Sequence, residues 1–188
     1  MKNVRSGQTL LELIIAIGVI MVSTLSATTL IVSTINAGQV SQTKVEAANF
    51  SREGVELLRG IRDSNWLKRD QNVTDISTGN VYSWNTGLGA GNYVATFNGT
   101  AWNLVTYQSI DAVNLIGQPN GQSYFTQNCS ANCTETRYHR KLTIIPTAET
   151  LLGVSRTYLS VISVVWWGSS PADPKTSYTA YERLYDWK

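Results

Sequence analysis

The residue near the start of the chain whose type and position best suit a chemical role is Glu12. From Leu10 to Val32 it is the only charged residue in an apolar run. About 20 apolar residues suffice for a helix that crosses a bilayer, and an acidic group at mid-membrane costs roughly 2.5–3.5 kcal/mol. Such carboxylates are usually paired, yet no Lys or Arg lies between Arg5 and Lys44. We therefore expect the partner cation of Glu12 to come from outside its own helix.

Cys129 and Cys133 are the second pair of residues whose types and spacing suit chemistry. Two cysteines four apart suit a redox pair or half of a zinc site, but a structural zinc needs two more ligands. Lys2 and Arg5 precede the apolar run, so the N-terminus is expected to stay cytoplasmic and the rest to be translocated. In an exported domain a disulfide closing a small loop is the preferred interpretation, and two free thiols are the alternative.

Residues for catalysis are scarce in this sequence. The sole histidine, His139, lies in an expected strand between the cationic Arg137 and Lys141, which indicates a surface position. There is no nucleophile–base pair beyond it, no glycine-rich phosphate loop and no metal-binding motif. We therefore expect neither a cofactor nor an enzyme. Lys and Arg exceed Asp and Glu by 15 to 13, and Lys2 and Arg5 account for the excess of two. The sequence has no clustered basic face of the kind that predicts nucleic-acid binding.

Three interpretations of the N-terminal stretch compete. A cleaved secretory signal peptide has an apolar core of about 7–15 residues and a small-x-small site after it. The run here is longer and contains a charge. An uncleaved signal anchor fits the length but leaves Glu12 unexplained. The third interpretation is a short basic leader that is removed ahead of Glu12.

That third interpretation comes from a family resemblance. The segment Gly7-Gln8-Thr9-Leu10-Leu11-Glu12 resembles the cleavage and methylation signature of type IV prepilins and pseudopilins. The resemblance implies that residues 1–7 are a leader, that a prepilin peptidase cuts between Gly7 and Gln8, and that Gln8 is then N-methylated. Phenylalanine or methionine is more usual where Gln8 stands. The resemblance also implies that Glu12, the fifth mature residue, pairs with the N-terminal amine of a neighbouring subunit.

The resemblance implies a structural function for the whole chain. It would be a minor pilin-like subunit of a type IV pilus-like filament, made as a single-pass inner (cytoplasmic) membrane protein with its N-terminus in the cytoplasm. Assembly would move it into an extracellular or periplasmic filament. Its partners would be other pilin subunits, the prepilin peptidase, the membrane and the assembly machinery. Two alternatives stay open: a pseudopilin of a type II secretion or DNA-uptake apparatus, and a membrane-anchored adhesin that never polymerises.

The element that must position Glu12 is a long N-terminal helix. No proline occurs before Pro119, and the apolar run passes into an amphipathic one. We expect a transmembrane and assembly half at 8–33 and an amphipathic half at 34–62 that packs on the head. Asp63-Ser64-Asn65 is the expected stop. The apolar stripe of the second half comprises Ala47, Phe50, Gly54, Leu57 and Ile61, with Leu58 beside it. Charged residues such as Glu53 lie mostly off this stripe and are expected to be solvated.

Residues 63–188 are predicted to form a globular antiparallel head. A connecting loop is expected over 63–92. Asn98-Gly99 favours a two-residue type I′ turn between 93–97 and 100–104. This turn would place Phe97 opposite Thr100 and Ala95 opposite Trp102, with the apolar face toward the helix.

Three further strands are expected at 137–145, 158–167 and 177–187, joined by turns at 146–153 and 168–174. The middle strand is apolar on both faces, which is typical of a central strand. In the first strand Tyr138, Leu142 and Ile144 share one face. The expected fold is therefore α+β: a long N-terminal helix packed on an antiparallel sheet, a pilin-like architecture.

Overall fold

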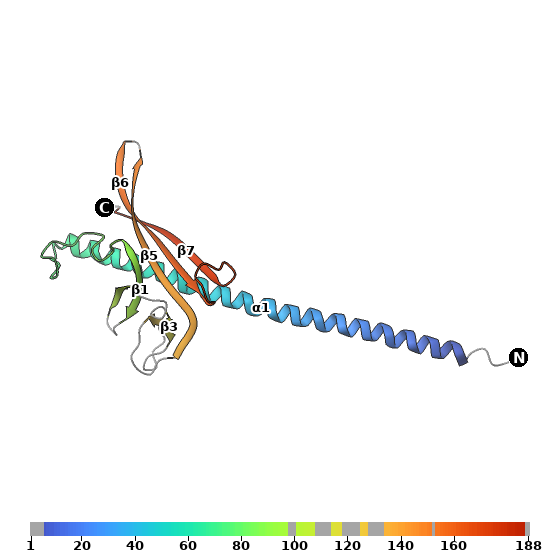
Figure 1. Ribbon diagram of the computed structural model, residues 1–188. Coiled ribbons are helices and arrows are strands. Elements are labelled where there is room, and N and C mark those ends of the chain that lie inside the picture. Colours follow the sequence, from blue (N-terminus) through green and yellow to red (C-terminus); the bar gives the residue numbers. More distant parts are fainter. Residues whose placement is uncertain are drawn as a thin grey trace. The chain divides into compact units, whose positions relative to one another are not determined.

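The computed structural model describes residues 6–97, 101–107, 114–117, 125–127, 134–151 and 153–186. Its helix α1 (Ser6–Asp70) and an antiparallel sheet of seven strands confirm the predicted α+β class (Figure 1). The chain divides into two compact units, Met1–Thr43 and Lys44–Lys188. Each unit is described by itself below.

The sheet of the second unit is built around one long strand, β5. Both β1 and β3 pair with successive parts of one edge of β5, and β6 pairs with the other edge. The pairs β1–β2, β3–β4 and β6–β7 complete the sheet. The strands are β1 (Gly91–Phe97), β2 (Trp102–Thr106), β3 (Asn114–Gly117), β4 (Phe125–Gln127), β5 (Thr134–Leu151), β6 (Val154–Trp166) and β7 (Ser177–Tyr185).

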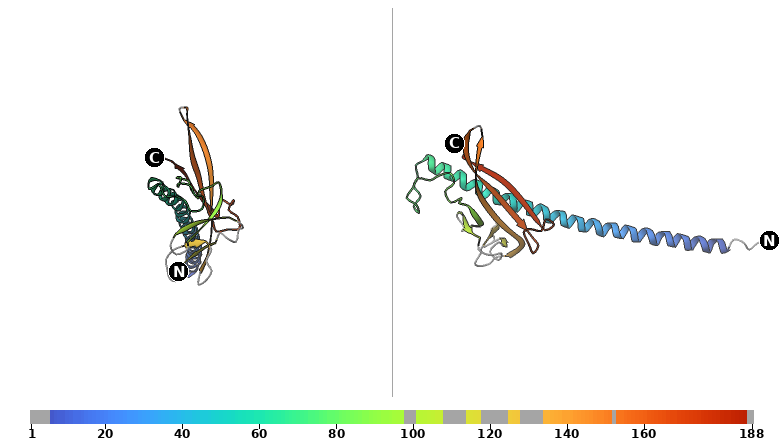
Figure 2. Two further views of the ribbon diagram at one scale, coloured as in Figure 1. Left: turned by 90° about the vertical axis from the view of Figure 1, so that its left-hand side faces the viewer. Right: turned by 45° about the horizontal axis from the view of Figure 1, so that its top comes forward.

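Residues 44–70 of α1 cover one face of this sheet (Figure 2). Leu58 is fully buried at the centre of the core. The predicted stripe is correct for its small residues and Leu58. The residues of α1 that are buried against the sheet, however, lie along a line beside the predicted one. Three members of the predicted stripe are only half-buried, namely Phe50, Leu57 and Ile61. The buried line runs through Ala47, Ser51, Gly54, Val55, Leu58 and Trp66, and the main core adds Leu142, Ile144, Leu159, Val161 and Leu184 from the sheet.

Small residues bring α1 unusually close to the sheet. A Cβ atom on Gly54 would lie 2.7 Å from Leu142 Cδ2 and 2.7 Å from Ser163 Oγ, so a larger residue would push the helix away. One turn earlier the Ser51 hydroxyl donates to the Ser163 carbonyl oxygen at 2.7 Å and accepts from the Ala180 N–H at 3.0 Å. This hydroxyl bridges β6 and β7 where Ser163 and Ala180 are paired, and it fixes the register of the helix on the sheet.

The helix continues past the predicted stop at Asp63-Ser64-Asn65, because tertiary contacts hold its last two turns. The Asn65 amide donates to the carbonyl oxygens of Trp84 at 3.2 Å and Thr86 at 2.7 Å. The next residue, Trp66, is buried, and its indole N–H donates to Asp186 at 3.1 Å. Polar residues that suit a turn therefore serve here as anchors for the connecting loop.

Asn72 ends the helix. Its φ of 52° is left-handed, a conformation that Asn tolerates better than most residues. The Val73 N–H donates to the Lys68 carbonyl oxygen at 2.9 Å, and the Asn72 N–H donates to the Arg69 carbonyl oxygen at 3.0 Å. These two bonds form a Schellman motif, which satisfies carbonyls that a helix end leaves free. The loop that follows also closes the core, since Trp84 and Leu88 are buried in it.

The β1–β2 register differs from the prediction by two residues. Phe97 lies opposite Trp102 and Ala95 opposite Leu104, so residues 98–101 connect the strands and the two-residue turn is wrong. The rings of Phe97 and Trp102 lie 5.1 Å apart, and such a cross-strand aromatic pair stabilises a sheet more than a Phe–Thr pair. A shift of two preserves the faces, and Ala95 is buried in the core with the helix as predicted.

The turn predicted at 146–153 is also wrong. The strands β5 and β6 pair without interruption from His139–Trp166 to Leu151–Val154, and Gly153 has a left-handed φ of 79°. Pro146 is tolerated inside β5 because β1 pairs with that strand only as far as Ile144, so part of its edge is open. The central position predicted for β6, between β5 and β7, is confirmed.

Candidate functional site

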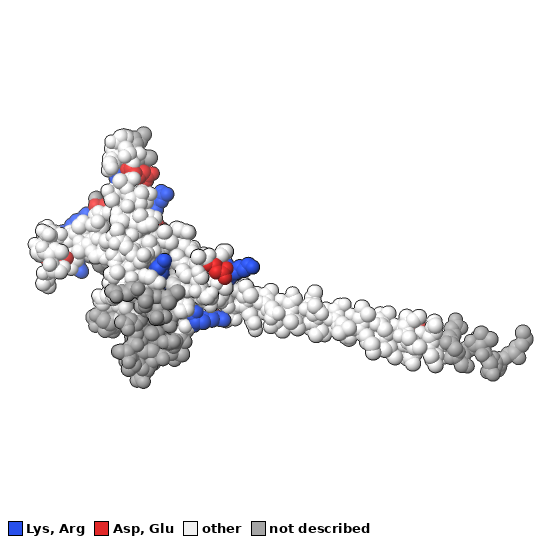
Figure 3. All heavy atoms as spheres, viewed as in Figure 1, with Lys and Arg blue, Asp and Glu red and all other residues white. Residues whose placement is uncertain are grey.

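The described part of the first unit is an exposed and mainly apolar helix. Every described side chain from Thr9 to Gln42 is exposed, and α1 contains a window of mean hydropathy 2.3 that is long and apolar enough to cross a membrane. On the face shown in Figure 3 this segment carries almost no charged atoms. This helix is compatible with a single-pass membrane anchor.

Hydroxyl groups do not make the surface of this helix polar, because they bond to its own backbone. The Ser23 hydroxyl donates to the Val19 carbonyl oxygen at 2.7 Å, and the Thr28 hydroxyl donates to the Thr24 carbonyl oxygen at 2.8 Å. The same i to i−4 bond is made by Thr24, Ser26, Thr29 and Thr34. A polar group in lipid must be satisfied within the protein, and these are. The segment can therefore meet lipid or another apolar helix.

Glu12 lies near the beginning of this segment as its only described charge. The backbones of Gly7 and Gln8, the predicted cleavage and methylation residues, lie in the first turn of α1. The next basic residue along the chain is Lys44, about nine turns of helix away at about 3.6 residues per turn. Beyond its first turn, α1 therefore has no nearby basic residue that could pair with Glu12. The predicted disulfide residues Cys129 and Cys133 lie outside the described residues.

In the second unit a charged group is buried between helix and sheet. Arg140 is fully buried on the face of β5 that meets α1. Its Nη1 donates to the Phe50 carbonyl oxygen at 3.2 Å and lies 3.3 Å from Glu53 Oε1. The Nε and Nη2 atoms are buried with no hydrogen-bond partner among the described residues. Burial lowers the pKa of Arg140, and the nearby Glu53 carboxylate opposes that shift. Glu53 is therefore the counter-ion of a buried charge.

The expectation that the charged face of the helix is merely solvated is wrong for two further residues. The Tyr138 hydroxyl donates to the Glu46 carboxylate. Burial raises the pKa of Tyr138, and the hydrogen bond to Glu46 raises it further. Arg59 Nη2 lies 3.1 Å from Glu182 on β7. Acidic and basic residues of α1 thus tie the helix to β5 and to β7.

His139 was expected on the surface, but it is half-buried on the opposite face of the sheet. Its ring stacks on Trp166 with centroids 5.3 Å apart, and burial lowers its pKa below the ordinary value of 6.5. Its neighbour Trp166 is buried in a small cluster with Val94. The imidazole is therefore a packed side chain and has no metal-binding partners among the described residues.

The stability of the head should fall in mild acid because of His139. Protonation favours the unfolded state, so this contribution is fully present above pH 6.5 and is lost as the pH falls through the lower folded-state pKa. We expect His139→Gln to flatten the fall in unfolding free energy between pH 7 and about pH 5. Denaturant titrations of the full chain in detergent measure it. Thr143→Ala, on the same face, should keep the parent slope, and equal slopes for parent and His139→Gln would contradict the assignment.

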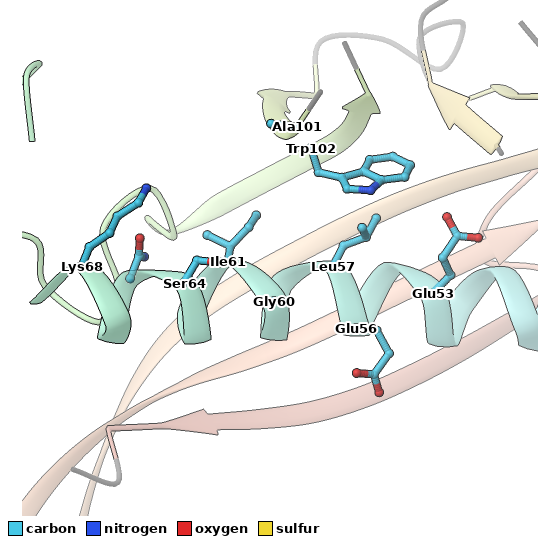
Figure 4. Close-up of a pocket in the computed structure, with 10 residues that line it drawn as sticks. Glu53, Glu56, Leu57, Gly60, Ile61, Ser64, Lys68, Ala101 and Trp102 are labelled. Atoms are coloured by element: carbon cyan, nitrogen blue, oxygen red, sulfur yellow. The ribbon is translucent and has the colours of Figure 1, made fainter. Parts of the chain in front are cut away.

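An open groove of about 530 Å³ lies between α1 and the edge of β2 (Figure 4). Its apolar wall is formed by Leu57, Ile61 and Trp102. Glu53 lies at one end and Lys68 at the other, whereas the Glu56 side chain points away from Trp102 and pairs with Arg59. No motif in the sequence indicates this groove, because it is formed by side chains of α1 and β2 that are far apart along the chain.

No protein-family model, curated protein or solved structure matches this chain. The features that bear on function are therefore the N-terminal segment, the helix that joins it to the head, and the groove. The long apolar helix and the antiparallel sheet are compatible with a pilin-like fold.

Proposed function

We propose that this chain is a structural subunit of a type IV pilus-like filament. One observation carries the proposal: a single uninterrupted helix has an apolar first part and a second part that forms the core of a sheet domain, and the Gly7-to-Glu12 spacing stands at its start. An anchor alone would need only the apolar part. A helix whose second part also belongs to the head suits a subunit in which one element serves both assembly and head folding.

In this proposal a prepilin peptidase removes residues 1–7, Gln8 becomes the methylated N-terminus, and Glu12 pairs with that amine on a neighbouring subunit. The membrane holds the subunit with its N-terminus cytoplasmic before assembly, and assembly machinery moves it into the filament. The exposed apolar surface of residues 9–42 supports this account, because copies of one helix can cover it for each other. The role is structural and requires no cofactor.

The test is processing at Gly7. We expect Gly7→Leu to keep residues 1–7 attached, because a bulky side chain blocks a site that requires glycine, whereas the parent chain begins at Gln8. Intact-mass measurement of membrane protein distinguishes the two states, and an added methyl group on Gln8 would support methylation. Gly18→Leu is the matched control, since a Cβ at Gly18 meets nothing within 4 Å. A mature mass that does not change in Gly7→Leu would overturn the cleavage site.

Filament membership decides between this proposal and its alternatives. The subunit should be present in fibres sheared from the producing cells. Its presence only in a short periplasmic secretion or uptake structure would favour a pseudopilin. Its absence from every fibre would leave a membrane-anchored binding head.

A further inference from the structure

The outer edge of β7 is the longest strand edge that pairs with no described strand. On its inner side β7 pairs with β6 over its whole length of nine residues, in one register and without a bulge (Figure 1). The edge strands β2 and β4 are only five and three residues long. The open part of β5 contains Pro146, which cannot donate a ladder hydrogen bond. Short edges and prolines limit unwanted strand pairing, and β7 has neither protection.

Alternate residues of β7 direct their main-chain groups toward this outer edge. Just beyond the ends of the two strands, the Trp167 N–H donates to the Thr176 carbonyl oxygen at 3.0 Å. In the same register, the Ala180 N–H donates to the Ser51 hydroxyl that bridges β6 and β7. Even-numbered residues therefore face β6, and the alternation of an antiparallel pair makes the odd-numbered residues face outward. The outward-facing residues are Thr179, Tyr181 and Arg183.

A second groove, of about 490 Å³, lies between β7 and α1. It is lined by residues 178–182 of β7 and by one side of α1 that includes Arg52, Glu56 and Arg59. Arg59 is held by two carboxylates, Glu56 at 2.6 Å and Glu182 at 3.1 Å. Arg52 is exposed and has no ion-pair partner among the described residues. The groove therefore combines an open strand edge with one cation that is available to a ligand.

We propose that β7 binds an extended segment of another protein, which adds a strand to the sheet and carries an acidic side chain for Arg52. Only an extended backbone matches a row of outward N–H and C=O groups, and these main-chain bonds supply the affinity in strand addition. The described open stretches of β2, β4 and β6 contain no acidic residue, and Glu149 of β5 stands opposite Arg156 on its own hairpin. The binding surface lies wholly in the head, so it does not depend on the proposed filament.

Fluorescence anisotropy with a labelled peptide and the full chain in detergent tests the proposal. The probe is a short peptide of alternating valine and threonine with one central glutamate. Tyr181→Pro should lower its affinity roughly tenfold, because proline removes an N–H from the outer edge and leaves the ladder to β6 intact. Tyr181→Val keeps that N–H and should bind the peptide as the parent does, and Thr179→Pro repeats the test at a second outward position. A parent that does not bind, or proline variants that bind equally well, overturn the proposal.

A change of charge tests the role of Arg52. Arg52→Glu should lower the affinity for the glutamate peptide about two- to fivefold, the range of an exposed ion pair. The same peptide with lysine in place of glutamate should bind Arg52→Glu better than it binds the parent. Lys44→Glu is the matched control, because Lys44 is exposed on α1 and does not line the groove. Equal losses in Arg52→Glu and Lys44→Glu overturn the preference for an acidic segment.

Hydrogen exchange gives a measurement that needs no variant. When the tyrosines of the full chain are labelled with a nitrogen isotope, the Tyr178 N–H, which faces β6, should exchange slowly with and without peptide. The Tyr181 N–H faces outward, and saturating peptide should slow its exchange roughly tenfold or more. Unchanged exchange at Tyr181 overturns strand addition. Self-association of the peptide-free chain that protects Tyr181 would assign the edge to a second copy and overturn the separate partner.

Discussion

Replacing Glu12 with alanine or glutamine should nearly abolish incorporation of this chain into filaments while leaving membrane insertion, processing and head folding intact. Glu12 is the only charged residue among the described residues 9–42, so this carboxylate is where a charge-specific contact can form. In the proposed assembly its partner is the N-terminal amine of a neighbouring copy. Without Glu12 that amine is buried unpaired, which costs roughly 3–5 kcal/mol, so incorporation should fall at least tenfold.

The measurement is the ratio of subunit in sheared filaments to subunit in membranes, by immunoblot of parent and variant. The sharpest control keeps the charge and moves it. The double variant Leu11→Glu with Glu12→Leu rotates the carboxylate by about 100° around the helix. It should be as defective as Glu12→Ala, because a paired charge needs one geometry. Parent-like incorporation of Glu12→Ala, or of the moved carboxylate, would show that Glu12 does not direct assembly.

The second large effect is expected at Glu53, which looks like an ordinary surface acid in the sequence. Glu53→Ala should lower the unfolding free energy of the head by about 2–4 kcal/mol. The reason is Arg140, which is fully buried and would lose its counter-ion. The figure stays below the top of the range for buried pairs, since the Glu53 side chain is 35% exposed and water screens it.

A double variant separates the charge effect from lost packing. Arg140→Met keeps an unbranched side chain of similar length and removes the buried charge, so Glu53→Ala in that background should cost less than about 1 kcal/mol. Glu56→Ala is the matched control, three residues along the helix and paired at the surface with Arg59. Denaturant unfolding of the full chains in detergent gives the unfolding free energies of the parent, the two single variants, the double variant and the control. Equal costs of Glu53→Ala in both backgrounds would remove the electrostatic explanation.

The class of the fold follows from periodicity, and the errors arise where tertiary contacts override local preference. The apolar and amphipathic halves of the helix and the alternation in β5 were predictable from spacing alone. The helix end was not, because Asn65 favours a turn locally but is held in the helix by the carbonyl oxygens of Trp84 and Thr86. Asn98-Gly99 similarly favours a two-residue turn, yet pairing of Phe97 with Trp102 sets another register.

Arg140 and His139, neighbours on β5, illustrate how much of the site the sequence carries. Arg140 stands in alternation with Tyr138 and Leu142, so its burial was implied by the period of two that predicted their face. A charged residue on the buried face of a strand indicates that the helix packed against it provides a counter-ion. His139 carried no such signal, because its cover comes from Trp166 on the neighbouring strand, and strand pairing is not written in local spacing.

The bridge made by the Ser51 hydroxyl also has a consequence for the order of synthesis. Its two partners, Ser163 and Ala180, follow it by 112 and 129 residues. At about 5–20 residues per second, the helix waits roughly 6–25 s for the strands that will cover it. The apolar first part of α1 is therefore synthesised well before the head can fold. The head can fold completely only after β7 has been synthesised. The second half of the helix must therefore avoid non-native contacts until synthesis of the chain is almost complete.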